Sequence, residues 1–215
     1  MLGRVDRPAD RTPPHRPVLV YLARHGETEW NRVGRWQGMT DIPLSDVGRA
    51  QARALGAGLR GRGIVEVHAS DLSRASETAE IVAGALGIAS LARDARLRER
   101  GFGCFEGLTR EECAARHADA WTRYLTDRTA TPPGGEPQRD VASRVVAVLT
   151  EIARAPRATG DATLVISHGG TIRTFIHEVT GAAPPPLDNG ALFLARWADG
   201  RFVAVERVDD SPIFI

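Results

Sequence analysis

The chain of 215 residues contains no lysine, so all 28 of its basic side chains are arginine. This absence excludes a P-loop of the Walker type, a Schiff-base lysine and a lysine that acts as a general base. The formal net charge of +1 provides no excess of either sign that would favour nucleic acid or a membrane surface as a partner. Arginine offers a planar fork of donors, which suits phosphate or carboxylate.

Cysteines and long hydrophobic runs are also scarce. The two cysteines, Cys104 and Cys113, match neither a disulfide framework nor a metal-ligand spacing, so we predict no metal site. No apolar run reaches the length of a membrane span, and residues 1–17 contain no apolar core of a secretory signal. Proline, arginine and aspartate in residues 1–17 indicate a flexible N-terminal arm. We predict a cytoplasmic protein with a single domain over residues 18–215.

Short apolar runs alternate with amphipathic helical patterns along this domain. Three continuous apolar runs are typical of strands covered on both faces, at 18–23, 65–70 and 162–167. Helical patterns occupy 45–63, 71–86, 109–125, 138–154 and 170–181. Two alternating runs at 191–197 and 201–208 predict an antiparallel pair joined by the turn Ala198-Asp199-Gly200.

Two of the helical patterns carry more specific predictions. Ser45 would cap the helix over 45–63, and Gly87 would end the helix over 71–86. Their buried stripes would be Val47, Ala50, Ala54 and Leu55 in the former, and Leu72, Ala75, Ala79, Val82 and Leu86 in the latter.

Strands that alternate with helices predict a three-layer α/β/α sandwich with a mostly parallel sheet. In such sheets ligands bind beyond the carboxyl ends of the strands. Polar residues follow three predicted strands, as Arg24-His25-Gly26, as Ser70-Asp71 with Arg74, and as Ser167-His168-Gly169-Gly170. Arg74 would lie in the first turn of its helix, where backbone N–H groups favour an anion. Two arginines and two histidines would thus meet at one sheet edge and suit a phosphoryl group.

Each of these residues also has a plainer structural interpretation. A single histidine more often packs or faces solvent than reacts, and we assign that role to the remaining histidines: His15, His68, His117 and His177. An arginine near a helix N-terminus often only reaches solvent. The joint occurrence of the polar residues at three strand ends favours a site.

Six segments occur in one order along the chain: ARHGETEWN (23–31), QGMTDIPLSDVGRAQA (37–52), SDLSRASETA (70–79), LRERGFGCFEG (97–107), PPGGE (132–136) and ISHGGTIR (166–173). Together they resemble the histidine phosphatase superfamily, the phosphoglycerate mutase-like proteins. The resemblance runs from about residue 18 to the last strands and implies a phosphoglycerate mutase-like fold, with 18–215 as one histidine phosphatase domain. It also implies a reaction through phosphohistidine without metal or cofactor.

The resemblance assigns roles to the residues at the strand ends. His25 would attack the phosphorus, because neutral imidazole is a nucleophile near pH 7. A backbone carbonyl that accepts from one ring N–H would keep the other nitrogen free for attack. Fixed donors would bind the phosphoryl oxygens, and the resemblance supplies Arg24, Arg74 and His168 for this. Further phosphate or substrate contacts would come from Asn31, Gln37, Gly38 and Gly169.

Glu99 aligns with the family's acid/base glutamate. It would donate a proton to the leaving oxygen and later accept one from water. The rival carboxylates are Glu27 and Glu106, and the structural alternative for Glu99 is a surface position in an arginine-rich stretch.

Residues 100–139 would cover the site as a cap. The side chains there that could contact the leaving group are Arg110, His117, Trp121, Tyr124 and Arg128, although we favour simple packing for Trp121 and Tyr124. Phe105 and Pro137 depart from the family pattern, in which tryptophan and a small polar residue are common at these positions. These two departures leave the substrate contacts open.

We therefore predict a phosphomonoesterase that transfers the phosphoryl group of a small phosphorylated metabolite to water. A cofactor-dependent phosphoglycerate mutase is the alternative, although QGMTDIPL and FGCFEG resemble the phosphatase branch and the length leaves no room for the mutases' inserted segment. The remaining alternative is a catalytically silent phosphate-binding protein. Such a protein would not need to retain all five of the charged groups present here, His25, Arg24, Arg74, Glu99 and His168. The exposed last strands leave a homodimer open, and we predict neither nucleic acid nor membrane as a partner.

Overall fold

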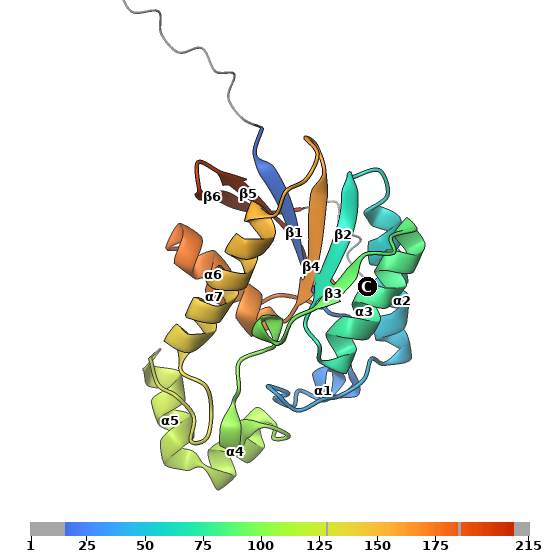
Figure 1. The fold of residues 1–215 in the computed structure, drawn as a ribbon. Coiled ribbons are helices and arrows are strands. Elements are labelled where there is room, and N and C mark those ends of the chain that lie inside the picture. The colour runs from blue at the N-terminus through green and yellow to red at the C-terminus, as the bar shows by residue number, and fades with distance from the viewer. Residues whose placement is uncertain (1–15, 128, 185, 209–215) are drawn as a thin grey trace, which may run out of the picture.

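The computed structural model describes residues 16–127, 129–184 and 186–208. Residues 1–15 of the predicted arm, with His15, and also Arg128 lie outside the described residues. A six-stranded sheet forms the centre of the fold (Figure 1), and its strands are β1 (Val18–Arg24), β2 (Ile64–Ala69), β3 (Leu91–Arg93), β4 (Ala162–Ser167), β5 (Leu192–Ala198) and β6 (Arg201–Arg207).

The sheet has the order β3-β2-β4-β1-β5-β6. The first four strands in this order run parallel, while β5 is antiparallel to β1 and β6 is antiparallel to β5. The expected mostly parallel sheet and the final antiparallel pair are confirmed. Strand β3 is missing from our prediction, because its three residues are too few to show a periodic pattern.

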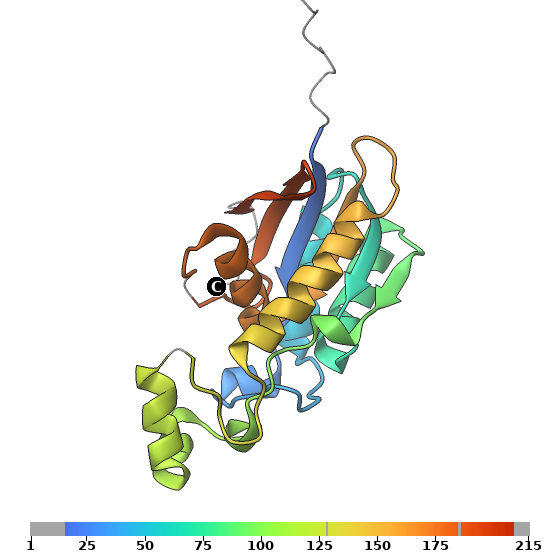
Figure 2. The ribbon, with the colours of Figure 1, turned by 60° about the vertical axis from the view of Figure 1, so that its left-hand side comes forward.

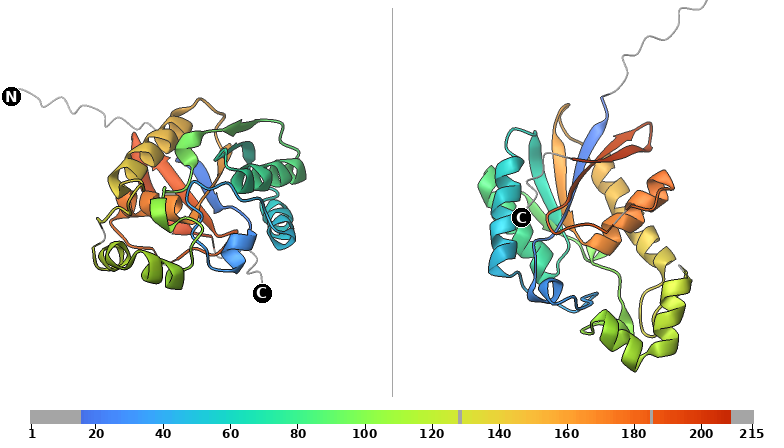
Figure 3. Two further views of the ribbon diagram at one scale, coloured as in Figure 1. Left: turned by 90° about the horizontal axis from the view of Figure 1, so that it is seen from below. Right: turned by 180° about the vertical axis from the view of Figure 1, so that it is seen from behind.

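Helices cover both faces of this sheet and form the two outer layers (Figure 3). On one face lie α2 (Asp46–Gly58) and α3 (Ser73–Leu86), and on the other lie α6 (Gln138–Arg154) and α7 (Gly169–Thr180). Outside these layers, beyond the strand ends, lie α1 (Glu29–Arg32), α4 (Arg110–Arg116) and α5 (Ala118–Thr126). Alternate residues of β1 point to opposite faces, so Val20 and Leu22 pack with α6 and α7 while Tyr21 and Ala23 pack with α2 and α3. The α/β/α sandwich follows from this alternation.

The predicted buried face of α2 is wrong except for Leu55. Val47 is 53% exposed, and the buried residues are instead Gly48, Gln51, Ala52, Leu55 and Gly56. A Cβ atom on Gly48 would lie 2.1 Å from the Glu27 carbonyl oxygen, and one on Gly56 would lie 2.8 Å from the Ala85 Cβ. The helix thus packs through its smallest residues, because close backbone approach outweighs the hydrophobic stripe. In α3, by contrast, Leu72, Ala75, Ala79 and Val82 are buried as predicted.

The helix predicted over 109–125 is two helices, α4 and α5, that are separated at His117 by a non-helical backbone (φ −137°, ψ 45°). Figure 2 shows both helices beyond the carboxyl ends of the strands, away from the sheet. They have a small core of their own, formed by Phe102, Phe105, Cys113 and Trp121. Trp121 therefore packs, as we favoured. Within the described ranges, no helix combines the length and apolarity needed to cross a bilayer.

Candidate active site

The three predicted strand ends meet at one edge of the sheet. Because β1 and β4 pair with Arg24 opposite Ser167, the residues that follow them, His25 and His168, become neighbours. Their ring centroids are 5.1 Å apart at an angle of 61°. Arg74 is the second residue of α3, the helix that follows β2, and β2 lies beside β4 in the sheet. The topology thus brings the predicted cluster together.

His25 is buried and held in one tautomer. Its Nδ1 lies 2.6 Å from the carbonyl oxygen of Gly26, which can only accept, so Nδ1 carries the hydrogen and Nε2 keeps a lone pair. Burial, reinforced by the charges of Arg24 and Arg74, holds the pKa of His25 well below its ordinary value. The ring is therefore neutral near pH 7, with Nε2 available as a nucleophile.

Arg74 is completely buried. Its Nη1 donates to the Thr40 carbonyl at 2.9 Å and its Nη2 donates to the Gly38 carbonyl at 2.8 Å, which fixes the plane of the guanidinium. Burial lowers the pKa of Arg74 to about 10, so the side chain remains charged near neutral pH. The loop that holds it is fixed in turn by Glu106, whose carboxylate accepts from the backbone of Met39 and Thr40. Glu106 therefore has a structural role here.

Several buried nitrogen atoms around His25 have no hydrogen-bond partner among the described residues. They are Nε of Arg24, Nε of Arg74, and both ring nitrogens of His168. Buried polar atoms are nearly always hydrogen-bonded, so such a cluster indicates a ligand with several acceptor atoms. Burial, followed by the charge of Arg74, lowers the pKa of His168 well below its usual range, which leaves its neutral ring one N–H to donate. Arg24, Arg74 and His168 thus carry donor groups that no described residue uses.

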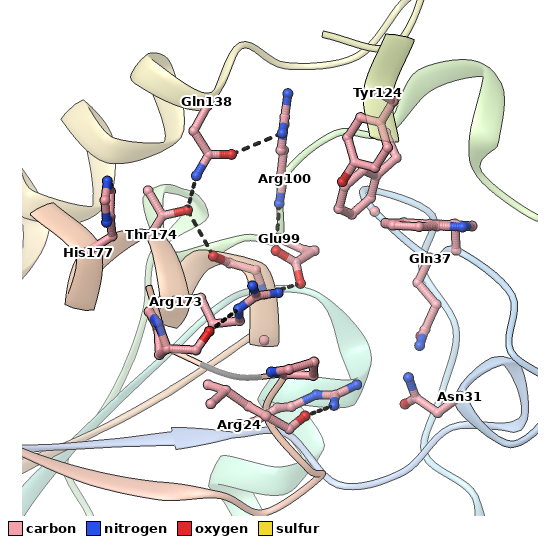
Figure 4. A pocket seen from close by; sticks show the side chains of 18 of the residues that line it. Arg24, Asn31, Gln37, Glu99, Arg100, Tyr124, Gln138, Arg173, Thr174 and His177 are labelled. Carbon is pink, nitrogen blue, oxygen red and sulfur yellow. Dashed lines mark hydrogen bonds between the residues drawn. The ribbon is translucent and has the colours of Figure 1, made fainter. Parts of the chain in front are cut away.

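Asn31 and Gln37 present their amides to the same cleft. The Asn31 oxygen accepts from the Thr28 backbone N–H at 3.1 Å, and the Gln37 oxygen accepts from the Thr28 hydroxyl at 3.0 Å. With the oxygens bound in this way, Figure 4 shows the amide nitrogens of Asn31 and Gln37 turned toward one another at the cleft. Asn189, which sequence reasoning missed, donates to the Asn31 oxygen and to the His25 carbonyl.

Glu99 lies at the N-terminus of α7. Its carboxylate accepts from the backbone N–H groups of Arg100 (2.9 Å), Gly170 (2.9 Å) and Thr171 (3.0 Å). The carboxylate takes the place of an N-cap, since the cap residue of α7 makes no side-chain bond of its own. Burial lowers the pKa of Arg24, and the charge of Glu99 is the largest opposing influence. Glu99 lines the same cleft as Arg24 and Arg74.

A cleft of about 1290 Å³ extends from this cluster to the helices beyond the sheet. Its inner lining includes Arg24, His25, Asn31, Gln37, Gly38, Arg74, Glu99 and Gly169. Trp36, Phe102 and Tyr124 form an aromatic wall of this cleft, since their rings contact one another. Across the cleft from Tyr124 lie Gln138, Arg173, Thr174 and His177 (Figure 4).

The other predicted residues differ in whether they line this cleft. Arg110, Tyr124 and Pro137 line it, so Tyr124 does more than pack. His177 lines it as well as facing solvent, which goes beyond the plain surface role that we predicted. His117, Trp121 and Glu27 are not part of its lining, and the Glu27 carboxylate accepts from the Ser45 hydroxyl instead.

Comparison with known proteins identifies the class. Residues 20–210 match the histidine phosphatase superfamily (branch 1), and the chain belongs to this superfamily. Among curated relatives, the probable phosphoglycerate mutase GpmB of Salmonella paratyphi B is 35% identical over 203 residues, which covers 89% of this chain and 85% of that protein.

Solved structures of other proteins are also similar to this chain. YhfR of Bacillus stearothermophilus has 32% sequence identity and a TM-score of 0.79, covering 88% of this chain and 96% of its own. A mycobacterial glucosyl-3-phosphoglycerate phosphatase in complex with VO3 has 28% identity and a TM-score of 0.76, covering 89% of this chain and 97% of its own. The family and fold inferred from the six sequence segments are therefore confirmed.

Proposed function

We propose that the chain is a metal-independent phosphomonoesterase that hydrolyses a small phosphorylated metabolite through a phosphohistidine at His25. The buried nitrogen atoms of Arg24, Arg74 and His168, which lack partners among the described residues, carry the proposal. A phosphoryl group bound against Nε2 of His25 supplies acceptors for all three side chains. Two guanidinium groups offset its charge, and the aligned amides of Asn31 and Gln37 add neutral donors.

The first half of the reaction forms the covalent intermediate. Nε2 of His25 bonds to phosphorus while the bond from phosphorus to the leaving oxygen breaks in line with it. The Glu99 carboxylate takes up a proton from solvent as the substrate binds and donates it to the leaving oxygen, and the alcohol departs.

The second half returns the enzyme to its starting state. Glu99, now a carboxylate, accepts a proton from water as the water oxygen attacks phosphorus and the N–P bond breaks. Inorganic phosphate leaves, His25 is again neutral with its Nδ1 hydrogen on the Gly26 carbonyl, and Glu99 returns its proton to solvent and is again the carboxylate that accepts from Arg100, Gly170 and Thr171. Neither step requires a metal ion or a cofactor.

The leaving group would occupy the outer cleft beneath the cap, residues 100–139. There Trp36, Phe102 and Tyr124 meet edge to face, with ring centroids 4.6 Å apart for Trp36–Phe102 and 5.6 Å apart for Trp36–Tyr124. Such a wall favours a leaving group with a planar or apolar part, because aromatic faces gain both burial and ring contacts. The cap would thus set specificity, while the sheet edge performs the phosphoryl transfer.

A phosphoglycerate mutase is the second candidate, favoured by the 35% identity to the relative named probable phosphoglycerate mutase GpmB. In a mutase the phosphoryl group on His25 would return to a substrate hydroxyl instead of passing to water. Incubation with 3-phosphoglycerate and a trace of 2,3-bisphosphoglycerate separates the two. A phosphatase releases inorganic phosphate, whereas a mutase accumulates 2-phosphoglycerate.

The nucleophile is tested with His25→Ala and, as a matched control, His68→Ala, a partly exposed histidine on β2 outside the cleft. Phosphate release from 4-nitrophenyl phosphate should fall to background in His25→Ala, remain in His68→Ala, and be insensitive to a chelator. Phosphate-labelled protein trapped after an alkaline quench should be absent from His25→Ala alone. Turnover by folded His25→Ala would refute the assignment.

A further inference from the structure

Arg144 on α6 uses every N–H of its guanidinium. Nη1 donates to the carbonyls of Arg96 and Arg98, both at 2.7 Å, and Nη2 donates to the Glu99 carbonyl at 3.0 Å. The other two bonds go to the Glu136 carboxylate, from Nε at 2.8 Å and from Nη2 at 2.9 Å. One side chain thus binds three carbonyls in the segment that ends at Glu99.

The backbone around Glu99 depends on such donors. It follows a single 3-10 turn, Ala95–Leu97, so it has little regular structure to supply its own hydrogen bonds. Besides Arg144, the hydroxyl of Ser167 donates to the Leu97 carbonyl at 2.8 Å and that of Thr171 donates to the Arg98 carbonyl at 2.7 Å. The carboxylate of Glu99 is held by α7, and its main chain is held largely by Arg144.

Glu136 extends this arrangement into the cap. Its N–H donates to the Gly101 carbonyl at 2.8 Å, and its carboxylate accepts from the Gly101 N–H at 3.3 Å. Its own carbonyl accepts from Nε of Arg100 at 2.8 Å. The Arg144 and Glu136 side chains are only 16% and 20% exposed, so solvent screens this ion pair less than a surface pair.

We propose that Arg144 and Glu136 are positioning residues that hold Glu99 in place for proton transfer; this rests on the proposed function, in which Glu99 is the acid and base. Neither side chain lines the cleft, so both act through Glu99 and not on the substrate. A displacement of about 1 Å in a catalytic group can cost on the order of 100-fold in rate. Loss of the hydrogen bonds made by Arg144 and Glu136 should therefore slow the reaction most where the leaving oxygen needs a proton.

The test compares Arg144→Gln with the wild type on two esters. Phenyl phosphate has a poor leaving group that needs the acid, whereas 4-nitrophenyl phosphate has a good one that leaves as an anion. We expect kcat/KM of Arg144→Gln to fall by about tenfold or more on phenyl phosphate and by no more than about threefold on 4-nitrophenyl phosphate. Arg144→Lys, which keeps the charge but lacks the planar fork, should show the same contrast.

Arg157→Gln is the matched control. Arg157 follows the other end of α6, is also largely buried, and also donates to a carbonyl and pairs with a glutamate, Glu66. Its replacement should change the two esters by the same factor. Thermal unfolding establishes that each variant is folded, and if Arg144→Gln is not, Glu136→Gln takes its place and should show the selective loss.

Combination with Glu99→Gln separates this proposal from the one on which it rests. Glu99→Gln should itself lose far more activity on phenyl phosphate, and Arg144→Gln added to it should cause no further selective loss. If Glu99→Gln affects both esters equally, the acid role of Glu99 in the proposed function is wrong. If Glu99→Gln is selective but Arg144→Gln is not, the positioning role of Arg144 is refuted.

Discussion

Replacing Arg74 with methionine separates the cost of burying its charge from its role in binding phosphate. Arg74 is completely buried, and in the described part of the chain its hydrogen bonds go only to carbonyl groups. Burial lowers the pKa of Arg74 to about 10, which corresponds to roughly 3 kcal/mol at about 1.4 kcal/mol per tenfold change. Methionine removes this cost.

The substitution also removes the hydrogen bonds to the carbonyls of Gly38 and Thr40. Each is worth about 1 kcal/mol or somewhat more, since a buried carbonyl is left without a donor. The two effects nearly cancel, so the free energy of unfolding of Arg74→Met in phosphate-free buffer should lie within about 1–2 kcal/mol of the wild type. For a buried arginine this is a small change.

The ligand response should differ sharply. Inorganic phosphate at 100 times its Kd should stabilise the wild type by about 2.7 kcal/mol, by mass action on the folded state. Arg74→Met should lose most of this stabilisation, because it has lost one of the two guanidinium groups of the site. Urea unfolding with and without phosphate measures both quantities, and Arg53→Met on the exposed face of α2 is the control.

Two outcomes would refute this reasoning. Destabilisation of Arg74→Met by several kcal/mol without phosphate would mean that the buried charge of Arg74 does not lower the free energy of unfolding. An undiminished response to phosphate would mean that Arg74 does not bind the anion.

The structure supports three further predictions. Burial lowers the pKa values of His25 and His168, so below pH 6.5 the unfolded chain protonates these two rings while the folded protein does not. The free energy of unfolding should therefore fall with decreasing pH by up to about 1.4 kcal/mol per pH unit for each ring. Urea titrations between pH 7 and 5 should show that His168→Gln halves this slope. Tyr124→Ala should lower the ratio of kcat/KM for 2-naphthyl phosphate over phenyl phosphate by about three- to tenfold, since it removes part of the aromatic wall; an unchanged ratio would place the leaving group elsewhere. Gly38→Ala should lose at least about 1 kcal/mol of stability and much of the stabilisation by phosphate. The reason is that Gly38 has a φ of +54° and an added Cβ would lie 2.1 Å from Oε1 of Glu106. Wild-type behaviour in calorimetry would contradict this.

Local sequence patterns were sufficient to predict which polar residues would gather at the carboxyl edge of the sheet. Buried parallel strands are short apolar runs, and their carboxyl ends must lie at one sheet edge once helices connect them. His25 and His168 follow such runs directly, and Arg74 lies in the first turn of the helix after a third run, so the topology makes them neighbours. The six family segments then added Glu99, which no periodic pattern would have singled out.

Contacts between segments far apart in the chain could not be predicted in this way. Asn189 reaches the His25 carbonyl across 164 positions, and Arg144 reaches Glu99 across 45, while neither side chain belongs to a recognisable local pattern. The buried face of α2 is a further example, because Gly48 is selected by the close approach of the Glu27 backbone. Periodicity reports which face of an element is apolar. How closely two backbones approach, and which distant side chain satisfies a given carbonyl, is settled only when the layers pack together.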